Sequence, residues 1–415
     1  MTVLVLNSGS SSLKYAVFSD VERTDPTGPR RDPGVSDPGV RPHPALVRGG
    51  DHARLEHGIR ADATHATGAT HATGVTDVML RGTLDRVGAG GPADHAAAVG
   101  SVFDELERRG IERPRVVGHR LVHGGPDHLD PALVDDAVLA ALERAVPFAP
   151  LHLPAELGAI AAVRARFGDV PQVVCFDTGF HRSLPDVARR FALPGHLFDA
   201  GIRRYGFHGL SYEYIAAALP AARQHRAVFA HLGNGASMVA VRDGRSIDTT
   251  MGLTPTGGLV MGTRSGDLDP GLLLYLLDHG YDARALAHLV DHEAGLLAIS
   301  ATSSDMQRLI DHRATDPRAA LAIDVFCYQA RKSIGALAAA LGGIETLVFA
   351  GGIGEHAPVV RSEICRGLAH LGIELDDAAN AAGTPLISHG RCVVQIVRTD
   401  EERMIARHAR RLVPP

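Results

Sequence analysis

The sequence has few cysteines and no long apolar run. Its four cysteines are Cys175, Cys327, Cys365 and Cys392. They form no CxxC pair, which argues against both a disulfide framework and a structural zinc site. No run of about 18 apolar residues occurs, so no transmembrane helix is predicted. Residues 1–6 have no basic residue, and their apolar run is too short for a signal peptide. We therefore expect a reduced protein of the cytoplasm.

An excess of one sign of charge is also missing. The chain has 42 Lys and Arg against 47 Asp and Glu, a net charge of −5, so neither nucleic acid nor an anionic membrane is expected as a partner. Hydrophobic residues make up 45% of the 415 residues, which is enough for real cores. At about 150 residues per domain, this length predicts two domains. The balanced charge favours a small-molecule partner.

The composition changes between about residues 23 and 74. The tetrapeptide DPGV occurs twice, at 32–35 and 37–40, and the hexapeptide ATHATG occurs twice, at 63–68 and 69–74. Tandem repeats of Pro, Gly and Thr cannot bury a core. We expect a low-complexity surface insertion early in the first domain.

Two glycine-rich turns stand between apolar runs. HLGNGAS at 231–237 separates two such runs, which predicts strand, turn, strand. Because Gly233 and Gly235 lack a Cβ, a phosphate can approach the backbone there, and successive N–H groups can bind it. NSGSSS at 7–12 repeats the pattern near the start of the chain. The two copies favour a duplicated architecture with two phosphate-facing hairpins, although each turn alone is also compatible with a plain hairpin.

Two arginines lie beside glycines. Arg264, in MGTRSGD, follows a glycine-rich loop, and a guanidinium there can neutralise the charge of a phosphoryl group in transfer. Arg120, in GHRLVHGG, is interpreted as an anion-binding fork. A structural salt bridge is the alternative for Arg120.

A carboxylate and a histidine complete the candidate site. Asp177 follows the apolar run 173–176, and open α/β sheets place ligand-facing groups at the carboxyl ends of their strands. An Asx turn is the alternative. His208, in YGFHG, can donate to a transferring phosphoryl group, and a core histidine bonded to backbone is its alternative.

Local signals predict several further elements. Ser211 is expected to cap a helix over 214–219. GGIGE at 351–355 is expected as a glycine turn after a strand, without the GxGxxG spacing of a dinucleotide site. Thr399 and Glu402 are expected to form the capping box of the last helix, which leaves Glu401 free. Helical periodicity is found at 94–109, 133–145, 154–166 and 319–341.

In their order along the chain, these motifs resemble those of the acetokinase family, within the acetate and sugar kinase, chaperone and actin superfamily. The matching segments are NSGSSSLKY at 7–15, GHRLVHGG at 118–125, FDTGFH at 176–181, YGFHG at 205–209, HLGNGAS at 231–237, MGLTP at 251–255, MGTRSGDLDPG at 261–271, AGGIGE at 350–355 and TDEE at 399–402. They span nearly everything except the insertion.

The resemblance implies an α/β fold. It is the two-domain, duplicated ribonuclease H-like arrangement of the actin-like ATPases, with mixed central sheets and a cleft between the domains. The first domain would cover 1–177 and be completed by a C-terminal helix over about 400–415. The second, nucleotide-binding domain would cover 181–399.

The resemblance also implies a reaction, namely reversible phosphoryl transfer from ATP to acetate, giving acetyl phosphate and ADP. The cofactor would be Mg²⁺ or Mn²⁺, held by Asn7 and Glu401, and the protein would be a homodimer. The implied catalytic residues are Asp177, His208, Arg264 and Arg120. The implied acyl-site residues are Arg120, Val122, Leu151, Phe207 and Pro255. The implied ATP-binding residues are Ser10, Ser12, Lys14, His231, Leu232, Gly233, Asn234, Gly235, Asp305, Met306, Gln307, Gly352, Ile353, Gly354, Glu355 and His356.

Two alternatives stay open at this point. A kinase of propionate or another short-chain carboxylate is the nearer one, because a single methylene discriminates by only about 1–3 kcal/mol, although Val122 and Phe207 favour two carbons. A chaperone-like or actin-like ATPase module is the second, and it would need no acyl site. The chain departs from the family pattern at Leu153, Gly257, Gln307 and His356, which bears mainly on nucleotide affinity.

Overall fold

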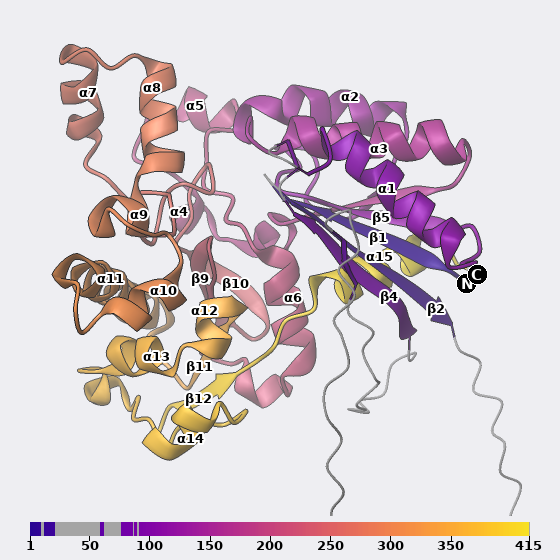
Figure 1. Cartoon of the computed structure of the whole chain (residues 1–415). Coiled ribbons are helices and arrows are strands. Elements are labelled where there is room, and N and C mark those ends of the chain that lie inside the picture. Colours follow the sequence, from indigo (N-terminus) through magenta and orange to yellow (C-terminus); the bar gives the residue numbers. More distant parts are fainter. Residues whose placement is uncertain (10–11, 21–58, 62–75, 86, 89–90, 415) are drawn as a thin grey trace, which may run out of the picture.

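The computed structural model describes residues 1–9, 12–20, 59–61, 76–85, 87–88 and 91–414 (Figure 1). Ser10 and most of the predicted insertion lie outside the described residues. None of the helices in these ranges combines the length and the apolar character that are needed to cross a bilayer.

The first sheet has seven strands in the order β3-β4-β2-β1-β5-β7-β6. Its strands are β1 (Val3–Ser8), β2 (Ser12–Asp20), β3 (Ile59–Ala61), β4 (Thr76–Asp85), β5 (Val116–Leu121), β6 (Ala132–Leu133) and β7 (Gln172–Phe176). β1 is antiparallel to β2 and parallel to β5, which is parallel to β7. The sheet is therefore mixed, and its central strands read as continuous apolar runs because both of their faces are covered.

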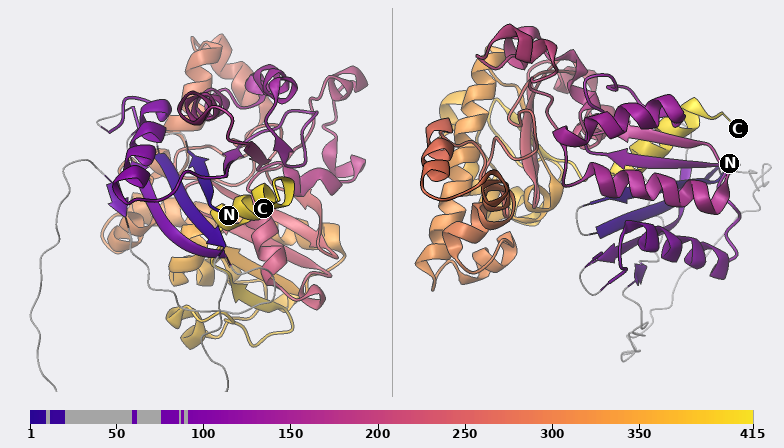
Figure 2. Two further views of the ribbon diagram at one scale, coloured as in Figure 1. Left: turned by 90° about the vertical axis from the view of Figure 1, so that its right-hand side faces the viewer. Right: turned by 90° about the horizontal axis from the view of Figure 1, so that it is seen from above.

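Side chains of β1 alternate between two cores. Leu4 and Leu6 pack with α1 (His95–Arg108) and α3 (Leu153–Phe167). Val3 and Val5 pack on the other face, with α15 (Glu401–Leu412). The period of two residues follows from the pleat of a strand. Figures 1 and 2 show the yellow α15 lying beside the indigo first strands, so the last described helix packs against the first sheet.

The second sheet has five strands in the order β10-β9-β8-β11-β12. Its strands are β8 (Ala227–Leu232), β9 (Ala236–Arg242), β10 (Arg245–Thr249), β11 (Thr346–Ala350) and β12 (Val393–Ile396). β8 and β9 form an antiparallel hairpin, and β8 is parallel to β11. The two predicted hairpins, β1–β2 and β8–β9, are thus confirmed, as is the predicted two-domain α/β fold.

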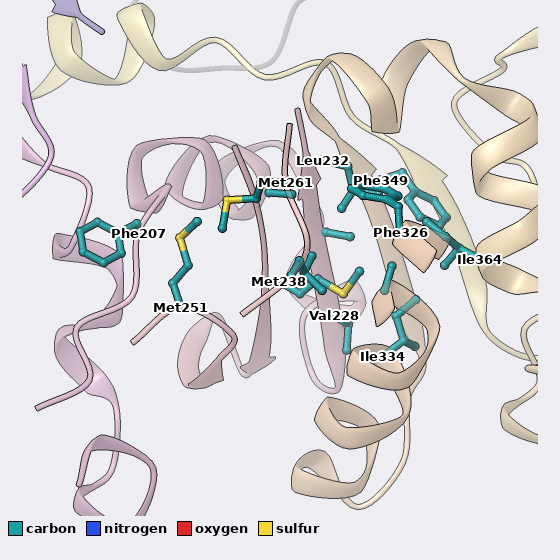
Figure 3. Close-up of a cluster of buried hydrophobic side chains, with 14 of the residues drawn as sticks. Phe207, Val228, Leu232, Met238, Met251, Met261, Phe326, Ile334, Phe349 and Ile364 are labelled. Atoms are coloured by element: carbon teal, nitrogen blue, oxygen red, sulfur yellow. The ribbon is translucent and has the colours of Figure 1, made fainter. Parts of the chain in front are cut away.

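The long helix α11 (Pro317–Leu341) contributes many of the buried side chains in the main hydrophobic core of the second half. Asp316 caps its start, and Gly342, with φ of 71°, ends it. Figure 3 shows Phe326 of α11 beside Phe349 of β11, with Met238 and Val228 of the hairpin below them. Burying each of these side chains contributes roughly 1.5–3 kcal/mol.

Shorter helices connect these elements. They are α2 (Asp136–Ala145), α4 (Asp186–Arg189), α5 (Gly195–Asp199), α6 (Gly209–Ala218), α7 (Pro270–Asp278), α8 (Ala283–His288), α9 (Gly295–Ser300), α10 (Met306–His312), α12 (Gly351–His356), α13 (Pro358–Cys365) and α14 (Asp377–Ala382). The 3₁₀ turns are η1 (Val146–Phe148), η2 (Gly179–Ser183), η3 (Ala221–Arg223) and η5 (Ala369–Leu371), and η4 (Leu289–Glu293) is a π-helical turn.

Three local predictions are wrong. Ser211 does not cap a helix, because α6 begins earlier, at Gly209, and places Ser211 inside its first turn. GGIGE forms the short helix α12 instead of a turn. The last helix is capped by Asp400, which accepts from the Arg403 amide at 2.9 Å, so Thr399 and Glu402 form no capping box.

We propose that the domain boundary lies between residues 177 and 181, directly after β7. The first sheet ends there, and the next strand, β8, belongs to the second sheet. Under this proposal α15 returns to the first domain.

We expect Gly118→Ala to destabilise the first domain by about 1–3 kcal/mol, the usual cost of overpacking. A Cβ at Gly118 would lie 2.6 Å from Cγ2 of Ile405, so α15 would have to shift. Urea unfolding measures the change in the free energy of unfolding. The control is Gly100→Ala in α1, where a Cβ meets nothing within 4 Å. Equal stability of the two variants would contradict this account.

Candidate active site

One large cavity joins the two halves of the molecule, with a volume of about 770 Å³. Both hairpin turns, α10, α12 and the start of α15 contribute to its walls. Most of the predicted nucleotide and metal residues line it, namely Asn7, Ser12, Lys14, His231, Gly233, Asn234, Gly235, Asp305, Met306, Gln307, Gly352, Ile353, Glu355, His356 and Glu401. Residues far apart in the sequence therefore converge on one space.

Some predicted residues lie elsewhere, and some lining residues were missed. Leu232 and Gly354 are buried against the second sheet and do not line the cavity. The missed residues are Gly9, Ser304, Gly351, Ala357, Thr399 and Glu402. Each of them lies within a predicted motif or directly beside a predicted residue. This adjacency is the sequence signal by which they could have been found.

Side chains approach the backbone closely at two glycines, Gly235 in the turn of the second hairpin and Gly262 in the loop after β10. A Cβ at Gly235 would lie 3.3 Å from Nε2 of His208 and 3.6 Å from Nη1 of Arg264. A Cβ at Gly262 would lie 2.1 Å from Oδ1 of Asn234. The glycines thus leave room for these three side chains, of which His208 and Asn234 line the cavity. His208 and Arg264, separated in sequence, meet over the Gly235 backbone.

Two polar side chains of the cavity wall at α10 are already hydrogen-bonded. Gln307 donates to Oδ1 of Asp311 at 2.8 Å, and Asp305 caps α10 by accepting from the Arg308 amide at 2.9 Å. Met306 is buried, and His356 is exposed. The predicted departures at Gln307 and His356 therefore fall on the wall formed by α10 and α12.

Oxygen ligands gather where α15 meets the first hairpin. Nδ2 of Asn7 donates to Oε2 of Glu401 at 3.3 Å and to Oε1 of Glu402 at 3.0 Å. Asp400 is held in ion pairs with Arg81 and Arg403, which fixes the start of α15. Among the described residues, no group of three or more His, Cys, Asp or Glu side chains could hold a metal by itself. Mg²⁺ commonly uses one or two carboxylates, with phosphates and waters completing its shell, and the residues here fit that mode.

Arg120 and Asp177 form a two-point ion pair. Nε of Arg120 donates to Oδ1 of Asp177 at 3.0 Å, and Nη2 donates to Oδ2 at 2.5 Å. Nη1 donates to the Ser8 carbonyl at 3.3 Å. Arg120 also lines the cavity, so the salt bridge and the anion fork, posed as alternatives, are compatible. Two of its five N–H donors remain for a ligand.

Burial raises the pKa of Asp177 to about 6, with Arg120 lowering it and Glu401 raising it. For Arg120, burial alone would lower the pKa, but Asp177 and Glu401 outweigh burial, so the pKa is raised. Asp177 is therefore a carboxylate at neutral pH that holds the guanidinium in place. Its backbone carbonyl also accepts from the Gly209 amide at 2.7 Å, which ties it to the start of α6.

His208 is held by a relay of hydroxyl groups. Its Nδ1 lies 2.8 Å from Oγ of Ser237, which lies 2.5 Å from the Tyr212 hydroxyl. Its ring stacks on His231 at 4.3 Å, and Nδ1 of His231 lies 2.8 Å from Oγ of Ser211. Nε2 of His208 is thereby left facing Gly235. The backbone-bonded alternative for His208 is not found, since its partner is a side chain.

The backbone and the charge state of His208 are both unusual. Its φ of 60° lies in the left-handed region, a strained conformation that is often retained at functional sites. Burial, followed by the influence of His231 and Arg120, lowers the pKa of His208 well below its ordinary value. His208 is therefore neutral at pH 7 and acts as a hydrogen-bonding group.

Arg264 is held by a neutral acceptor. Its Nη1 donates to the Pro255 carbonyl at 3.1 Å. Burial lowers its pKa, and the charge of Asp291 opposes this effect. Oδ1 of Asp291 accepts a hydrogen bond from Oγ1 of Thr256 at 2.5 Å. Because Thr256 directly follows Pro255, Asp291 contacts the same loop whose carbonyl holds Arg264. No local signal along the chain pointed to Asp291.

His152 was also missed. It precedes α3, and burial lowers its pKa to about 3, with further lowering by Arg264, Arg120 and His292. It is therefore a neutral group close to both arginines. Its signal was the rigid PFAPLH loop that ends at this residue.

The predicted acyl-site residues adjoin these groups. Val122 and Phe207 are buried, and Phe207 directly precedes His208. Pro255 gives its carbonyl to Arg264. Leu151, next to His152, is 45% exposed. None of the four lines the 770 Å³ cavity itself.

The duplicated hairpins and the glycine-lined cavity between two mixed sheets define a phosphotransferase with the actin-like ATPase fold. The chain belongs to the acetokinase family, whose model matches residues 63–407. It is 42% identical over 422 residues to an acetate kinase of Rhodopseudomonas palustris, covering 99% of this chain and 98% of that one. It is 44% identical to an acetate kinase of Rhizobium meliloti, over 99% of this chain and 98% of that one.

Solved structures agree with this assignment. An acetate kinase of Porphyromonas gingivalis has a TM-score of 0.78 at 31% identity, over 99% of both chains. A propionate kinase of Francisella tularensis has a TM-score of 0.80 at 30% identity, over 99% of this chain and 100% of that one.

We expect Ser237→Ala to lower kcat roughly tenfold, the equivalent of one lost hydrogen bond, with little change in the KM for ATP. The hydroxyl links Tyr212 to His208, so its loss frees the imidazole to rotate. Steady-state kinetics measure both constants. The control is Ser246→Ala, because Ser246 is an equally buried serine that bonds His181 at 2.9 Å away from the cavity. A normal kcat for Ser237→Ala would contradict the relay.

Proposed function

We propose that this protein catalyses reversible transfer of the γ-phosphoryl group of ATP to acetate, giving acetyl phosphate and ADP. The observation that carries the proposal is the meeting of His208 and Arg264 over the Gly235 backbone, at the end of the cavity that Arg120 also lines. Phosphoryl transfer asks a protein mainly for positioning and for neutralisation of charge. This end of the cavity supplies both.

The acceptor needs no strong base. Acetate is ionised at neutral pH and is already a nucleophile. Arg120, fixed by Asp177, keeps two N–H donors to hold its carboxylate. Neutral His208 donates through Nε2 to the equatorial oxygens of the migrating group, and Arg264 neutralises their charge. The apolar residues Val122, Phe207, Pro255 and Leu151 enclose the methyl group.

Nucleotide binding falls to the glycine backbones and the first hairpin. Gly233 and Gly235 allow the phosphates to approach the main chain, and Lys14 and Ser12 line the same cavity. Asn7 and Glu401, joined by Glu402, would hold Mg²⁺ or Mn²⁺. Such a divalent ion, when bound with ATP, supplies neutralisation of the β- and γ-phosphate charge.

A propionate kinase is the second candidate, favoured by the similarity to the Francisella tularensis protein. The buried Val122 and Phe207 support the smaller acid. A chaperone-like or actin-like module has less support, because such a module has no use for an arginine fork backed by an apolar wall. The four free, buried cysteines support a cytoplasmic, reducing location.

We further propose that the protein is a homodimer that associates through α7. Leu274 and Tyr275 are 64% and 57% exposed, and no residue of α7 is buried. An apolar surface of this kind usually marks an interface. A second copy of the chain would cover it.

The activity test offers the purified protein ATP, Mg²⁺ and either formate, acetate, propionate or butyrate, and traps the acyl phosphate as a hydroxamate. We expect acetate to give the highest kcat/KM, with propionate lower by up to about 10–200-fold, the discrimination that one methylene allows. We expect this order because the buried side chains of Val122 and Phe207 favour the smaller acid.

The same panel on Arg120→Ala should show a steeply raised KM for acetate and unchanged nucleotide binding. Arg113→Ala, which removes an exposed surface arginine, is the control. Absence of hydroxamate from every acid would refute the proposed function. A preference for propionate would favour the second candidate.

We expect Leu274→Glu to convert a dimer into monomers, because a charge in the interface is not compensated there. Light scattering after size exclusion measures the mass. Leu321→Glu, at a 54% exposed leucine of α11, is the matched control and should leave the dimer intact. A monomeric wild type, or a dimeric Leu274→Glu protein, would disprove this interface.

A further inference from the structure

A buried carboxylate lies behind the acyl site and has no role in the chemistry above. Glu156 is in the first turn of α3 and is 2% exposed. Both of its oxygens accept from the Val122 amide, Oε1 at 3.2 Å and Oε2 at 3.0 Å. Among the described residues, that single amide is its hydrogen-bond donor. A buried ionised carboxylate with one neutral donor is strongly disfavoured.

The surroundings of Glu156 favour its neutral form. Burial raises the pKa of Glu156 to about 8, with Arg120 and the Val122 amide lowering it and Asp177 raising it. Arg120 lies in β5, two residues before Val122, which follows the end of that strand, and Asp177 holds Arg120. Glu156 thus faces the ion pair that is proposed to bind the acyl carboxylate.

We propose that Glu156 is a positioning residue of the acyl site: its protonated carboxyl group holds the Val122 backbone beside Arg120, and its ionisation weakens the binding of the anionic acyl substrate. The inference rests on the proposed function, because acetate is taken as the anion that Arg120 binds.

Electrostatics gives the direction of the effect. Asp177 already balances most of the charge of Arg120, and a second carboxylate behind it would cancel what remains for a substrate anion. When Glu156 ionises, the KM for acetate should therefore rise. His208 and Arg264 lie on the phosphoryl side, so kcat should change less.

Other groups that face this site do not titrate between pH 7 and 9.5. The pKa of Asp177 is raised by burial only to about 6, and burial lowers the pKa of His152 to about 3. The pKa of Arg120 is raised, since Asp177 and Glu401 outweigh burial, and that of His208 is lowered by burial. Acetate itself is fully ionised. Glu156 is thus the facing group whose charge changes in this range.

The test measures kcat and the KM for acetate from pH 7 to 9.5, in the wild type, Glu156→Gln and Glu105→Gln. We expect the wild-type KM to rise by up to about tenfold per pH unit above 8, the limit for one ionising group. Glu156→Gln keeps the size and the acceptor for Val122 but cannot ionise, so its KM should stay flat. Glu105, a buried glutamate of α1 paired with Arg109, is the matched control and should behave as the wild type.

Stability gives a readout that does not depend on activity. Because the folded-state pKa of Glu156 lies above the unfolded value, its contribution to stability is complete below about pH 4.5 and is lost as the pH rises through about 8. Glu156→Gln should therefore lose less stability than the wild type between pH 6.5 and 9.5 in urea unfolding.

The outcomes separate the two proposals. A wild type that forms no acyl phosphate refutes the proposed function, and the unfolding comparison still tests Glu156. An active wild type with a pH-independent KM, or a Glu156→Gln protein with the same rise, overturns the inference. If Glu156→Gln does not fold, Glu156→Met, which fills the space without ionising, takes its place in the same comparison.

Discussion

The ion pair between Arg120 and Asp177 is the contact on which the rest of the site depends. Arg120 is the penultimate residue of β5 and Asp177 follows β7, two parallel neighbours whose carboxyl ends meet at one edge of the first sheet. The Asp177 carbonyl accepts from Gly209, where a Cβ would lie 2.3 Å from that carbonyl oxygen. This close approach fixes the start of α6, and with it the strained backbone of His208. Asp177 therefore connects Arg120, the proposed acyl-binding residue of the first sheet, to His208, the proposed phosphoryl-binding residue of the second half.

Much of this arrangement could be predicted from local signals, because strands, glycine turns and strand ends depend on nearby residues. The two hairpins, the central strands and Asp177 at the end of β7 were predicted in this way. The Ser211 prediction failed because a helix can begin before a good capping residue, and here Ser211 instead bonds His231. Asp291 and Glu156 could not be found by such signals. Their roles come from the charges that the fold brings near them, and spacing along the chain carries no trace of that proximity.

Burial divides the site into fixed charges and neutral donors. The pKa values of His208, His231 and His152 are all lowered, in each case chiefly by burial. The positive charge at the proposed site of phosphoryl transfer therefore belongs to Arg120 and Arg264, which stay protonated at any physiological pH. An active site built in this way keeps its attraction for anions near neutrality, and the histidines contribute direction to hydrogen bonds without adding repulsion between cations.

The position of α15 has a consequence for biosynthesis. Met404, Ile405 and Ala409 fill one face of a sheet whose first strand begins at Val3, and Gly118 has no side chain so that this helix can lie against it. While the ribosome is still translating the second half, that face of the first sheet remains uncovered. The nascent polypeptide cannot cover this face of the first sheet until α15 has left the exit tunnel. A product truncated before α15 would therefore expose an apolar surface to chaperones and proteases.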